Sequence, residues 1–377
     1  MRILIVEGGL QAISTARSLR DVGYEVGIWS QKENYAYKSS AISLKGKSIG
    51  GNPIEELIDF TSKEGFRVII PMSDKSAFLL SKNKNIIESS TGSKVAVPSL
   101  DTLTMAADKQ LLMKFLKQNN YPHPITFSED EIFSSPISQI PFPLLIKPNN
   151  SVGARGIVKV NNIDEVKSKL GSIKDKYGEC HFQEYISGNF PYFNVMLYRD
   201  KEGNCINYVV LEIIRFFPLS GGSSCMCKTV EKPDLVHLCS NVLKDLNYYG
   251  FADFDILQNS NGEYKIIEIN PRVPASLRGA AISGVNFPAL IVADQLNLPL
   301  PKFSYSPGKT LRYLGLDIMW FLKSPKRFKT HPSWFKFFGS DIFYQEGGYN
   351  DWKAMLSVLI SNLNKIEFKN GKFRKKD

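Results

Sequence analysis

Short apolar runs alternate with helical repeats over the first hundred residues. The runs with the length and composition of buried strands are RILIV at 2–6, YEVGIWS at 24–30 and FRVIIPM at 66–72. Between them, residues 11–22 and 54–65 repeat apolar positions at helical spacing. Strands that alternate with helices predict a parallel sheet covered by helices. The first strand leads into Gly8 and Gly9 without the GxGxxG turn of dinucleotide-binding folds, which disfavours NAD or FAD.

From residue 102 the pattern changes. Helical spacing recurs at 108–121, 163–173 and 234–246, and prolines or glycines flank short strand-like runs at 123–127, 142–148, 156–160 and 181–186. The stretch 193–216 predicts two long antiparallel strands with Lys201-Glu202-Gly203 at their turn. The second part of the chain is therefore expected to be α+β, after an α/β first part.

Composition is that of an ordinary soluble globular protein. The 377 residues are 43% hydrophobic and 22% charged, which predicts two or three packed units. No run approaches eighteen apolar residues, so no membrane span is expected, and the first strand lacks the cleavage site of a signal peptide. The five scattered cysteines favour reduced thiols and a cytoplasmic location over a metal or redox role.

Positive charge is concentrated at the end of the chain. Residues 301–377 hold fifteen Lys and Arg against six Asp and Glu, within a net charge of +10. Their aromatic and basic mixture could lie on an anionic membrane surface. The alternative, which we favour, is an appended helix that packs on the body and is followed by a solvated basic tail. The segment resembles no nucleic-acid-binding module, so nucleic acid is not expected as a partner.

The segment 254–270 combines a hairpin signal with acidic residues. Asn261-Gly262 favours a tight turn, and counting outward from it places Asp255 opposite Glu268. Side chains alternate along a strand, so Asn270 shares the face of Glu268. Two opposed carboxylates and an amide oxygen are hard ligands that suit Mg²⁺ or Mn²⁺. The alternative is a pair of solvated acids on an edge hairpin.

The stretch KPNNSVGARGI, 147–157, places a lysine at a strand end before a glycine loop. In the GxxxxGK[ST] phosphate loop the lysine follows the glycines, so this is another arrangement. Glycines allow backbone N–H groups to approach phosphate closely, and Arg155 adds positive charge. A solvated Lys147 is the alternative.

Several ordered motifs resemble the ATP-grasp superfamily of biotin carboxylase, carbamoyl-phosphate synthetase and D-alanine–D-alanine ligase. They are DK at 108–109, IKP at 146–148, the glycine loop, QEYISG at 183–188, ADFD at 252–255 and EINPR at 268–272. Weaker similarity points to D-aspartate ligases. The resemblance implies a Rossmann-like domain at 1–100, a two-subdomain ATP-grasp domain at 101–300 with a lid at about 121–186, and an appendage at 301–377.

The resemblance also implies roles for individual residues. ATP would be held by Lys109 and Lys147 at its phosphates, by a mobile loop with Ser151, Gly153, Ala154, Arg155 and Gly156, and by a hinge at Gln183, Glu184, Tyr185 and Ile186. Asp255, Glu268 and Asn270 would bind the metal. Arg272 and Lys147 would stabilise the transferring phosphoryl group, and Arg278 would clamp a substrate carboxylate. A structural salt bridge is the alternative for Arg272, and Arg215 and Lys228 are further substrate candidates.

One position departs from the family pattern. Phe190 stands where the family places an acidic residue at the ribose, so Asn189 or Asn194 is expected to substitute. The resemblance implies an enzyme that joins a small carboxylate to an amine through an acyl phosphate, and a homodimer is common in the family. The alternatives are a bicarbonate-using carboxylase or carbamoyl-phosphate-type enzyme, which the lack of a carrier or glutaminase domain disfavours, and a non-catalytic ATP-binding regulator.

Overall fold

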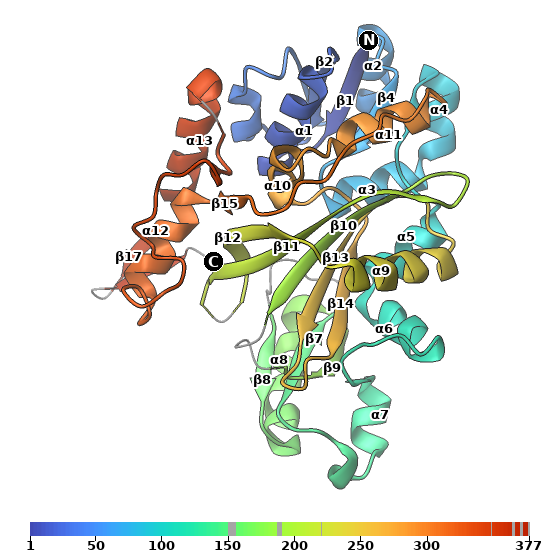
Figure 1. Ribbon diagram of the computed structural model, residues 1–377. Coiled ribbons are helices and arrows are strands. Elements are labelled where there is room, and N and C mark those ends of the chain that lie inside the picture. The colour runs from blue at the N-terminus through green and yellow to red at the C-terminus, as the bar shows by residue number, and fades with distance from the viewer. Residues whose placement is uncertain are drawn as a thin grey trace.

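Three larger sheets with helices around them and one two-stranded sheet, β17-β18, make up the described part of the chain (Figure 1). The computed structural model describes residues 1–149, 156–186, 191–219, 221–347, 349–363, 366–369 and 372–375. The predicted fold class is confirmed, since a parallel N-terminal sheet is followed by antiparallel sheets with helices.

The N-terminal sheet is parallel throughout, in the order β3-β2-β1-β4-β5. Its strands are β1 (Arg2–Val6), β2 (Glu25–Ser30), β3 (Leu44–Lys47), β4 (Val68–Pro71) and β5 (Lys94–Val95). The helices of this part are α1 (Leu10–Arg20), α2 (Pro53–Glu64), α3 (Asp74–Lys82), α4 (Lys84–Thr91) and α5 (Leu100–Ala107). The sequence pattern missed β3 because LKGK has no apolar run and pairs at the sheet edge.

The central sheet has the order β14-β13-β10-β11-β12-β15-β16. Its first five strands are β10 (Tyr192–Arg199), β11 (Cys205–Phe217), β12 (Ser223–Val230), β13 (Gly250–Gln258) and β14 (Tyr264–Asn270), and they pair antiparallel. The predicted turn at Lys201–Gly203 joins β10 to β11. Helices α6 (Lys109–Gln118) and α9 (Pro233–Asp245) pack on one face of this sheet through a shared apolar core.

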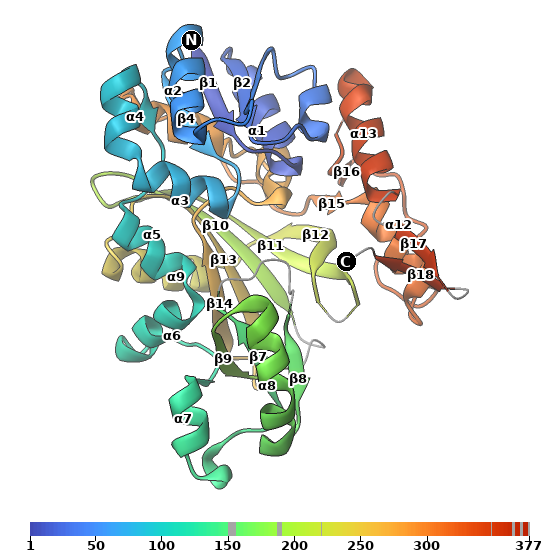
Figure 2. The same ribbon diagram turned by 180° about the vertical axis from the view of Figure 1, so that it is seen from behind.

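A smaller antiparallel sheet lies below the central one in Figure 2. It has the order β6-β9-β7-β8, with β6 (Thr126–Phe127), β7 (Leu144–Pro148), β8 (Val158–Val160) and β9 (Cys180–Glu184). Helices α7 (Glu129–Ser134) and α8 (Ile163–Tyr177) share its core. This unit falls within residues 121–186, the range predicted for a lid, although the division into domains stays a prediction.

One apolar core joins the N-terminal sheet to the central sheet. It contains Ile5 of β1, Ile13 of α1, Met196 of β10, Leu211 of β11 and Leu290 of α11 (Phe287–Gln295). The short helices η3 (Ala275–Leu277) and α10 (Arg278–Ile282) lead from β14 into this core. The end of β14 is therefore held between the two sheets.

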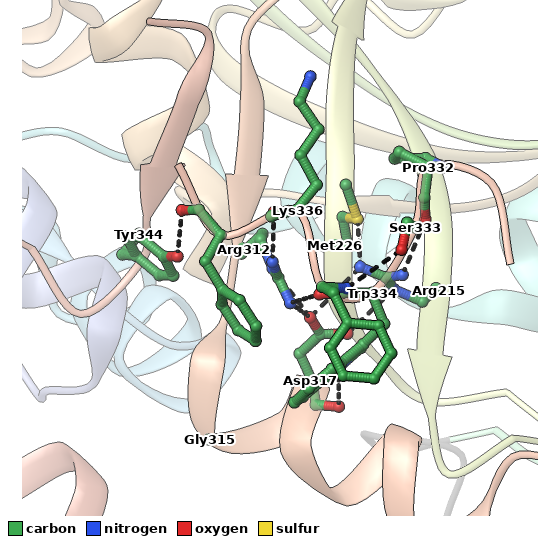
Figure 3. Close-up of polar contacts among 12 residues, drawn as sticks. Arg215, Met226, Arg312, Gly315, Asp317, Pro332, Ser333, Trp334, Lys336 and Tyr344 are labelled. Atoms are coloured by element: carbon green, nitrogen blue, oxygen red, sulfur yellow. Dashed lines mark hydrogen bonds and ion pairs between the residues drawn. The ribbon is translucent and has the colours of Figure 1, made fainter. Parts of the chain in front are cut away.

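The C-terminal region enters the central sheet and is not only an appendage. Strand β15 (Thr310–Arg312) pairs with β12, and β16 (Ile342–Tyr344) pairs with β15. The other elements are α12 (Leu314–Lys323), α13 (Trp352–Leu363), β17 (Ile366–Lys369) and β18 (Lys372–Lys375). Beneath this end of the sheet, the buried Asp317 pairs with Arg215 and Arg312 (Figure 3).

Within the described part of the chain, no single helix has the length and hydropathy of a membrane span. One pair of helical segments, Ala275–Ile282 with Phe287–Gln295, meets those criteria together but bends by 95° at its break. All residues of Phe287–Gln295 are buried in the core.

Candidate functional site

The hairpin of β13 and β14 carries the opposed carboxylates. Asp255 is the register partner of Glu268, so this predicted pairing is confirmed. The turn differs from the prediction, because Asn259 pairs with Glu263 around a three-residue loop. A register shift beyond Asp255 then leaves Ile267 as an extra residue in β14. The longer loop and the extra residue cancel, which restores the predicted pairing.

Amide side chains surround Asp255. Asn194 on β10 lies opposite Asp255 and donates from its Nδ2 to the Asp255 Oδ1. Asn270 donates from Nδ2 to the Asp255 Oδ2 at 3.3 Å and to the Asp253 Oδ2 at 3.5 Å. Asn194 therefore lies beside the candidate metal residues, and the sequence had assigned it to the ribose.

Burial and neighbouring charges shift the pKa values of the two opposed carboxyl groups in opposite directions. Burial, reinforced by the charge of Glu268, raises the pKa of Asp255 well above its usual range. Burial also acts to raise the pKa of Glu268, but the charge of Lys109, a hydrogen bond from Asp255 and the charge of Lys147 lower it to about 2. The two shifts have opposite directions, so protonation of this pair is favoured at Asp255 over Glu268.

Two lysines approach this pair from different elements. Asp108 caps α6 by accepting from the N–H groups of Gln110 and Leu111, which sets Lys109 in the first turn. The Lys109 Nζ then lies 3.1 Å from the Glu268 Oε2. Lys147 on β7 is buried, and burial lowers its pKa to about 8.

A hydrogen bond fixes the position of Lys147. Its Nζ donates to the Gln183 Oε1 on β9 at 2.7 Å. Gln183 donates in turn to the Thr126 Oγ1 at 3.2 Å. The lysine is therefore held near the end of β7, an inner strand of the smaller sheet, where its charge interacts with Glu268 and Asp255 of the central sheet.

Arg272 links the end of β14 to the N-terminal sheet unit. Its Nε lies 3.1 Å from the Asp74 Oδ1, at the start of α3, and its Nη2 donates to the Asn270 Oδ1 at 3.3 Å. The capping box of Ser73 and Ser76 holds the first turn of α3, which carries Asp74. A carboxylate oxygen of Asp74 and the amide oxygen of Asn270 thus position the guanidinium beside the carboxylate pair.

These groups line one cavity of about 220 Å³. Its walls include Asp74, Lys109, Lys147, Tyr192, Asp255, Glu268, Asn270 and Arg272. The structure therefore brings together the predicted metal residues, both predicted lysines and Arg272. Three cationic side chains around two carboxylates form a site that suits a polyphosphate with a divalent cation.

The donor set fits a hard divalent cation. Asp255, Glu268 and Asn270 supply oxygen atoms that would hold such a cation, and its charge would favour the ionised form of both carboxyl groups. Asn270 turns its NH₂ toward Asp255 and its oxygen toward Arg272, so coordination by its oxygen requires rotation of the amide. Among the residues that the structure describes, no three His, Cys, Asp or Glu side chains form a metal cluster alone, so phosphate oxygens would complete the shell.

The expected adenine hinge is partly engaged in the smaller sheet. The N–H of Glu184 donates to the Ile125 carbonyl at 2.8 Å, and the N–H of Tyr185 donates to the Pro143 carbonyl at 3.1 Å. The Tyr185 ring lies under the Lys159 Nζ, 3.9 Å from the ring centroid. An adenine contact here would use hinge carbonyls or the N–H of Ile186.

Gly156 is the described member of the predicted phosphate loop. Its φ is 73°, and an added Cβ would lie 2.7 Å from the Tyr177 ring, so this position requires glycine. The other loop residues that the sequence singled out lie outside the described residues, namely Ser151, Gly153, Ala154 and Arg155. Asn189 and Phe190, at the expected ribose position, also lie outside them.

Three predicted cations do not reach the cavity. Arg278 lines a separate apolar cavity with Phe337 and Tyr344. Arg215 is buried against Asp317 at 3.0 Å, so its charge serves a structural pair. Lys228 is exposed at a register position opposite Glu212 on β11. Their sequence positions near the motifs did not determine which face or layer they occupy.

Asp253, Asp74 and Tyr192 are site residues that sequence reasoning missed. Asp253 is two residues before Asp255, and the alternation of side chains along a strand would have placed both on one face. Its Oδ1 is buried without a hydrogen-bond partner, and burial raises its pKa to about 8. Asp74 belongs to another sheet unit, so no local sequence signal connects it to Arg272.

Comparison with known proteins agrees with this geometry. Residues 106–276 match the family model described as an ATP-grasp domain. The chain contains an ATP-grasp domain. The matched range runs from just before α6 to η3 and includes every wall residue of the cavity except Asp74. The hairpin, both lysines and Arg272 are thus parts of this domain.

Relatives of the ATP-grasp domain span several enzymes. The chain is 24% identical over 55% of its length to the carbamoyl phosphate synthase large chain of Methanospirillum hungatei. It is also 24% identical over 50% of its length to the D-aspartate ligase of Enterococcus faecium. These alignments cover 20% and 49% of the two relatives, so the chain spans half or less of their length.

A solved structure shares the fold over most of the chain. The biotin carboxylase–βγ-ATP complex from Campylobacter jejuni superposes with a TM-score of 0.67 at 17% identity, covering 81% of this chain and 73% of that one. The match extends beyond the ATP-grasp domain to both flanking regions. At this identity the likeness shows the fold alone.

Proposed function

We propose that this protein is an ATP-dependent ligase that joins a small carboxylate to an amine through an acyl phosphate, with release of ADP and phosphate. The observation that carries the proposal is the buried Asp255–Glu268 pair, surrounded by Lys109, Lys147 and Arg272 in one cavity. This arrangement binds and stabilises negative charge, and the described residues that line it include no nucleophile–base pair for covalent catalysis through the protein.

The chain's own side chains would act by position and charge. Lys147 and Lys109 would hold the phosphates of ATP, and Arg272 would stabilise negative charge on the γ-phosphoryl group as it transfers. A substrate carboxylate oxygen would attack the γ-phosphorus, and the bond to the β–γ bridging oxygen would break to release ADP. The amine would then displace phosphate from the acyl carbon.

Asp255, Glu268 and Asn270 would hold Mg²⁺ or Mn²⁺. When bound, the cation would supply charge neutralisation between the phosphate oxygens and the carboxylates. A bound cation would also counteract the raised pKa of Asp255, because both carboxyl groups would then face a positive charge. ATP affinity should therefore depend strongly on the divalent cation.

The test is a trapped half-reaction. Purified protein, Mg²⁺ and ATP are mixed with pools of small carboxylates, including L- and D-amino acids, and hydroxylamine is added to convert an acyl phosphate to a hydroxamate. ADP and phosphate are followed by phosphorus NMR. Glu268→Gln removes one candidate metal ligand, and Glu263→Gln is the matched control at the exposed hairpin end.

The result expected is carboxylate-dependent ADP with hydroxamate, lost in Glu268→Gln and kept in Glu263→Gln. Release of AMP and pyrophosphate would contradict the acyl-phosphate route. Turnover with bicarbonate alone would support the carboxylase or carbamoyl-phosphate alternative. Tight ATP binding without turnover on any pool would favour the regulator.

Two proposals concern partners. The aromatic side chains of Phe328, Phe335 and Phe338 are exposed in the basic C-terminal region, which supports contact with an anionic membrane surface. Sedimentation with anionic vesicles should then fall when Phe328 and Phe338 are replaced by Ser. Deletion of residues 301–377 is unsuitable because it would remove β15 and β16 from the central sheet. We also propose a homodimer, which light scattering would test.

A further inference from the structure

An apolar cavity lies in the C-terminal region, apart from the phosphate cavity. Its volume is about 410 Å³, which is in the range of small-molecule sites. It is enclosed by the first residues of α10 and α12, by β16 with the loop before it, and by α13. Helices α12 and α13 lie to one side of the central sheet in both views (Figures 1 and 2). The described walls of this cavity share no residue with the phosphate cavity.

Most walls of this cavity are aromatic or aliphatic side chains. They include Leu314 of α12, Phe337 of the loop before β16, and Met355 and Leu359 of α13. Phe338, another wall residue, is 87% exposed, so the cavity reaches the surface of the protein there. A ligand with an apolar part can therefore enter from solvent, and burial of that part favours binding.

One cationic side chain, Arg278, lines this apolar cavity. No hydrogen bond or ion pair joins its guanidinium to any residue that the structure describes. Of its three nitrogens only Nε is closed to solvent, so both Nη groups remain accessible. Burial and the nearby charge of Arg17 lower the pKa of Arg278, yet an arginine keeps its charge in a protein. An anion at the Nη groups would compensate this unpaired charge.

The acidic residue in the cavity wall, Glu346, does not pair with Arg278. Its Oε1 accepts from the N–H of Gly315 at 3.1 Å, and its Oε2 is closed to solvent. Its charge and that of Asp21 each affect the pKa of Arg278 less than the charge of Arg17 does. Burial also raises the pKa of Glu346, which acts against its negative charge. Arg278 therefore remains the group that an anionic ligand would contact.

We propose that this cavity binds a small carboxylate with an apolar chain or ring, and that the carboxylate pairs with the two Nη groups of Arg278. A planar guanidinium suits a carboxylate because it can donate two parallel hydrogen bonds. The ligand has its polar atoms at one end, because the remaining polar wall side chain is occupied: the Tyr344 hydroxyl donates to the Phe337 carbonyl at 2.6 Å (Figure 3). A peptide C-terminus would bury further polar groups without partners. This inference does not rest on the proposed ligase function.

The test is calorimetric titration with octanoate, 1-octanol and N-acetyl-leucyl-leucine. From butanoate to octanoate the affinity should rise about fourfold per added carbon, the equivalent of about 0.8 kcal/mol per buried CH₂. Octanoate should bind at least tenfold more tightly than 1-octanol, because only the acid forms charged hydrogen bonds. The dipeptide should bind more weakly than octanoate. Saturation with Mg²⁺ and a non-hydrolysable ATP analogue should leave the octanoate affinity within twofold, because the two cavities have separate walls.

Two variants locate the site. Arg278→Met should weaken octanoate binding at least tenfold and leave 1-octanol binding within twofold, which also shows that the cavity remains folded. Leu359→Trp fills the cavity and should weaken the binding of both ligands. Arg20→Met is the matched control, since Arg20 is exposed on α1 and its replacement should change neither affinity.

Four results would overturn the inference. They are equal affinity of wild type for octanoate and 1-octanol, octanoate binding unchanged in Arg278→Met or in Leu359→Trp, displacement of octanoate by the ATP analogue, and tighter binding of the dipeptide than of octanoate. Displacement would place the acid in the phosphate cavity, and a preference for the dipeptide would indicate a peptide C-terminus as the ligand. Failure of the ligase proposal would show separately, as absent hydroxamate with octanoate binding intact.

Discussion

Replacement of Asp317 by Asn tests what holds the C-terminal region in the central sheet. Asp317 and Arg312 are fully buried, and Arg215 is 2% exposed. The Asp317 carboxylate lies 3.0 Å from the Arg215 Nε and accepts from the Arg312 Nε at 2.9 Å. Asparagine keeps the shape and removes the carboxylate with which both arginines pair (Figure 3).

The expected loss of unfolding free energy in Asp317→Asn follows from the charges that remain. Removing one partner of a buried ion pair costs about 3–5 kcal/mol. Here the carbonyls of Pro332, Trp334 and Lys336 still accept from the guanidiniums, which favours the lower figure of roughly 3 kcal/mol. For a chain above 250 residues, each kcal/mol lowers Tm by about 2 °C, so we expect a fall of about 6 °C.

The assay combines global and local measurements. Urea unfolding and thermal denaturation report the loss of stability, and limited trypsin digestion reports release of the segment 326–336, where Lys326, Lys329 and Lys336 are exposed. Asp341→Asn is the control, since its pair with Lys336 at 3.6 Å is solvent-exposed and should contribute about 0–1 kcal/mol.

Equal stability of the Asp317 and Asp341 variants would refute the reasoning, as would unchanged trypsin resistance in Asp317→Asn. A triple variant with Met, Leu and Leu at positions 215, 312 and 317 is a second check. Apolar replacement of a whole buried ion cluster is often neutral, so this variant should be more stable than Asp317→Asn.

Three further predictions concern the phosphate cavity. Lys147→Met should weaken ATP binding by about 10- to 100-fold, the worth of a charged hydrogen bond, whereas the exposed Lys167→Met should not change it in calorimetry. Asp74→Asn should lower kcat by about tenfold with the ATP affinity unchanged, because Arg272 loses its positioning partner; a matching loss of ATP affinity would argue against this role. Burial raises the pKa of Asp253 from 3.8 to about 8, so the folded protein loses stability as pH rises through that range. In metal-free buffer, the Tm of Asp253→Asn relative to wild type should therefore become more positive from pH 5 to pH 8, and a constant difference would contradict the assignment.

Local patterns accounted for much of the candidate site. The hairpin pairing of Asp255 with Glu268 followed from a turn signal and strand alternation, and both features are local. The turn itself was predicted one residue too short, and an extra residue in β14 compensated for it. Such irregularities are hard to predict from a sequence, because the free energy that stabilises them comes from packing against the neighbouring strand.

The family resemblance placed Lys109, Lys147 and Arg272 at the cavity, where the structure has them, and it also implied a substrate role there for Arg278, which the structure places elsewhere. Arg278 follows the motif by only six residues, yet α10 turns it toward a different cavity. Asp74 shows the opposite case, since it is remote in sequence and contacts Arg272. A helix after a strand can present a side chain in any direction around its axis, and packing against α1 decides which.

The sequence by itself determined the parallel first sheet, the antiparallel strands after it, and the pair of opposed acids. These depend on periodicity, turn residues and spacing, which neighbouring residues carry. The tertiary structure alone decided that residues 310–312 and 342–344 extend the central sheet, that Arg215 is used in a buried ion pair, and that Arg278 lines a cavity with Met355 and Leu359. Those features join segments that are distant along the chain, and their positions are set by the free energy of packing whole layers together.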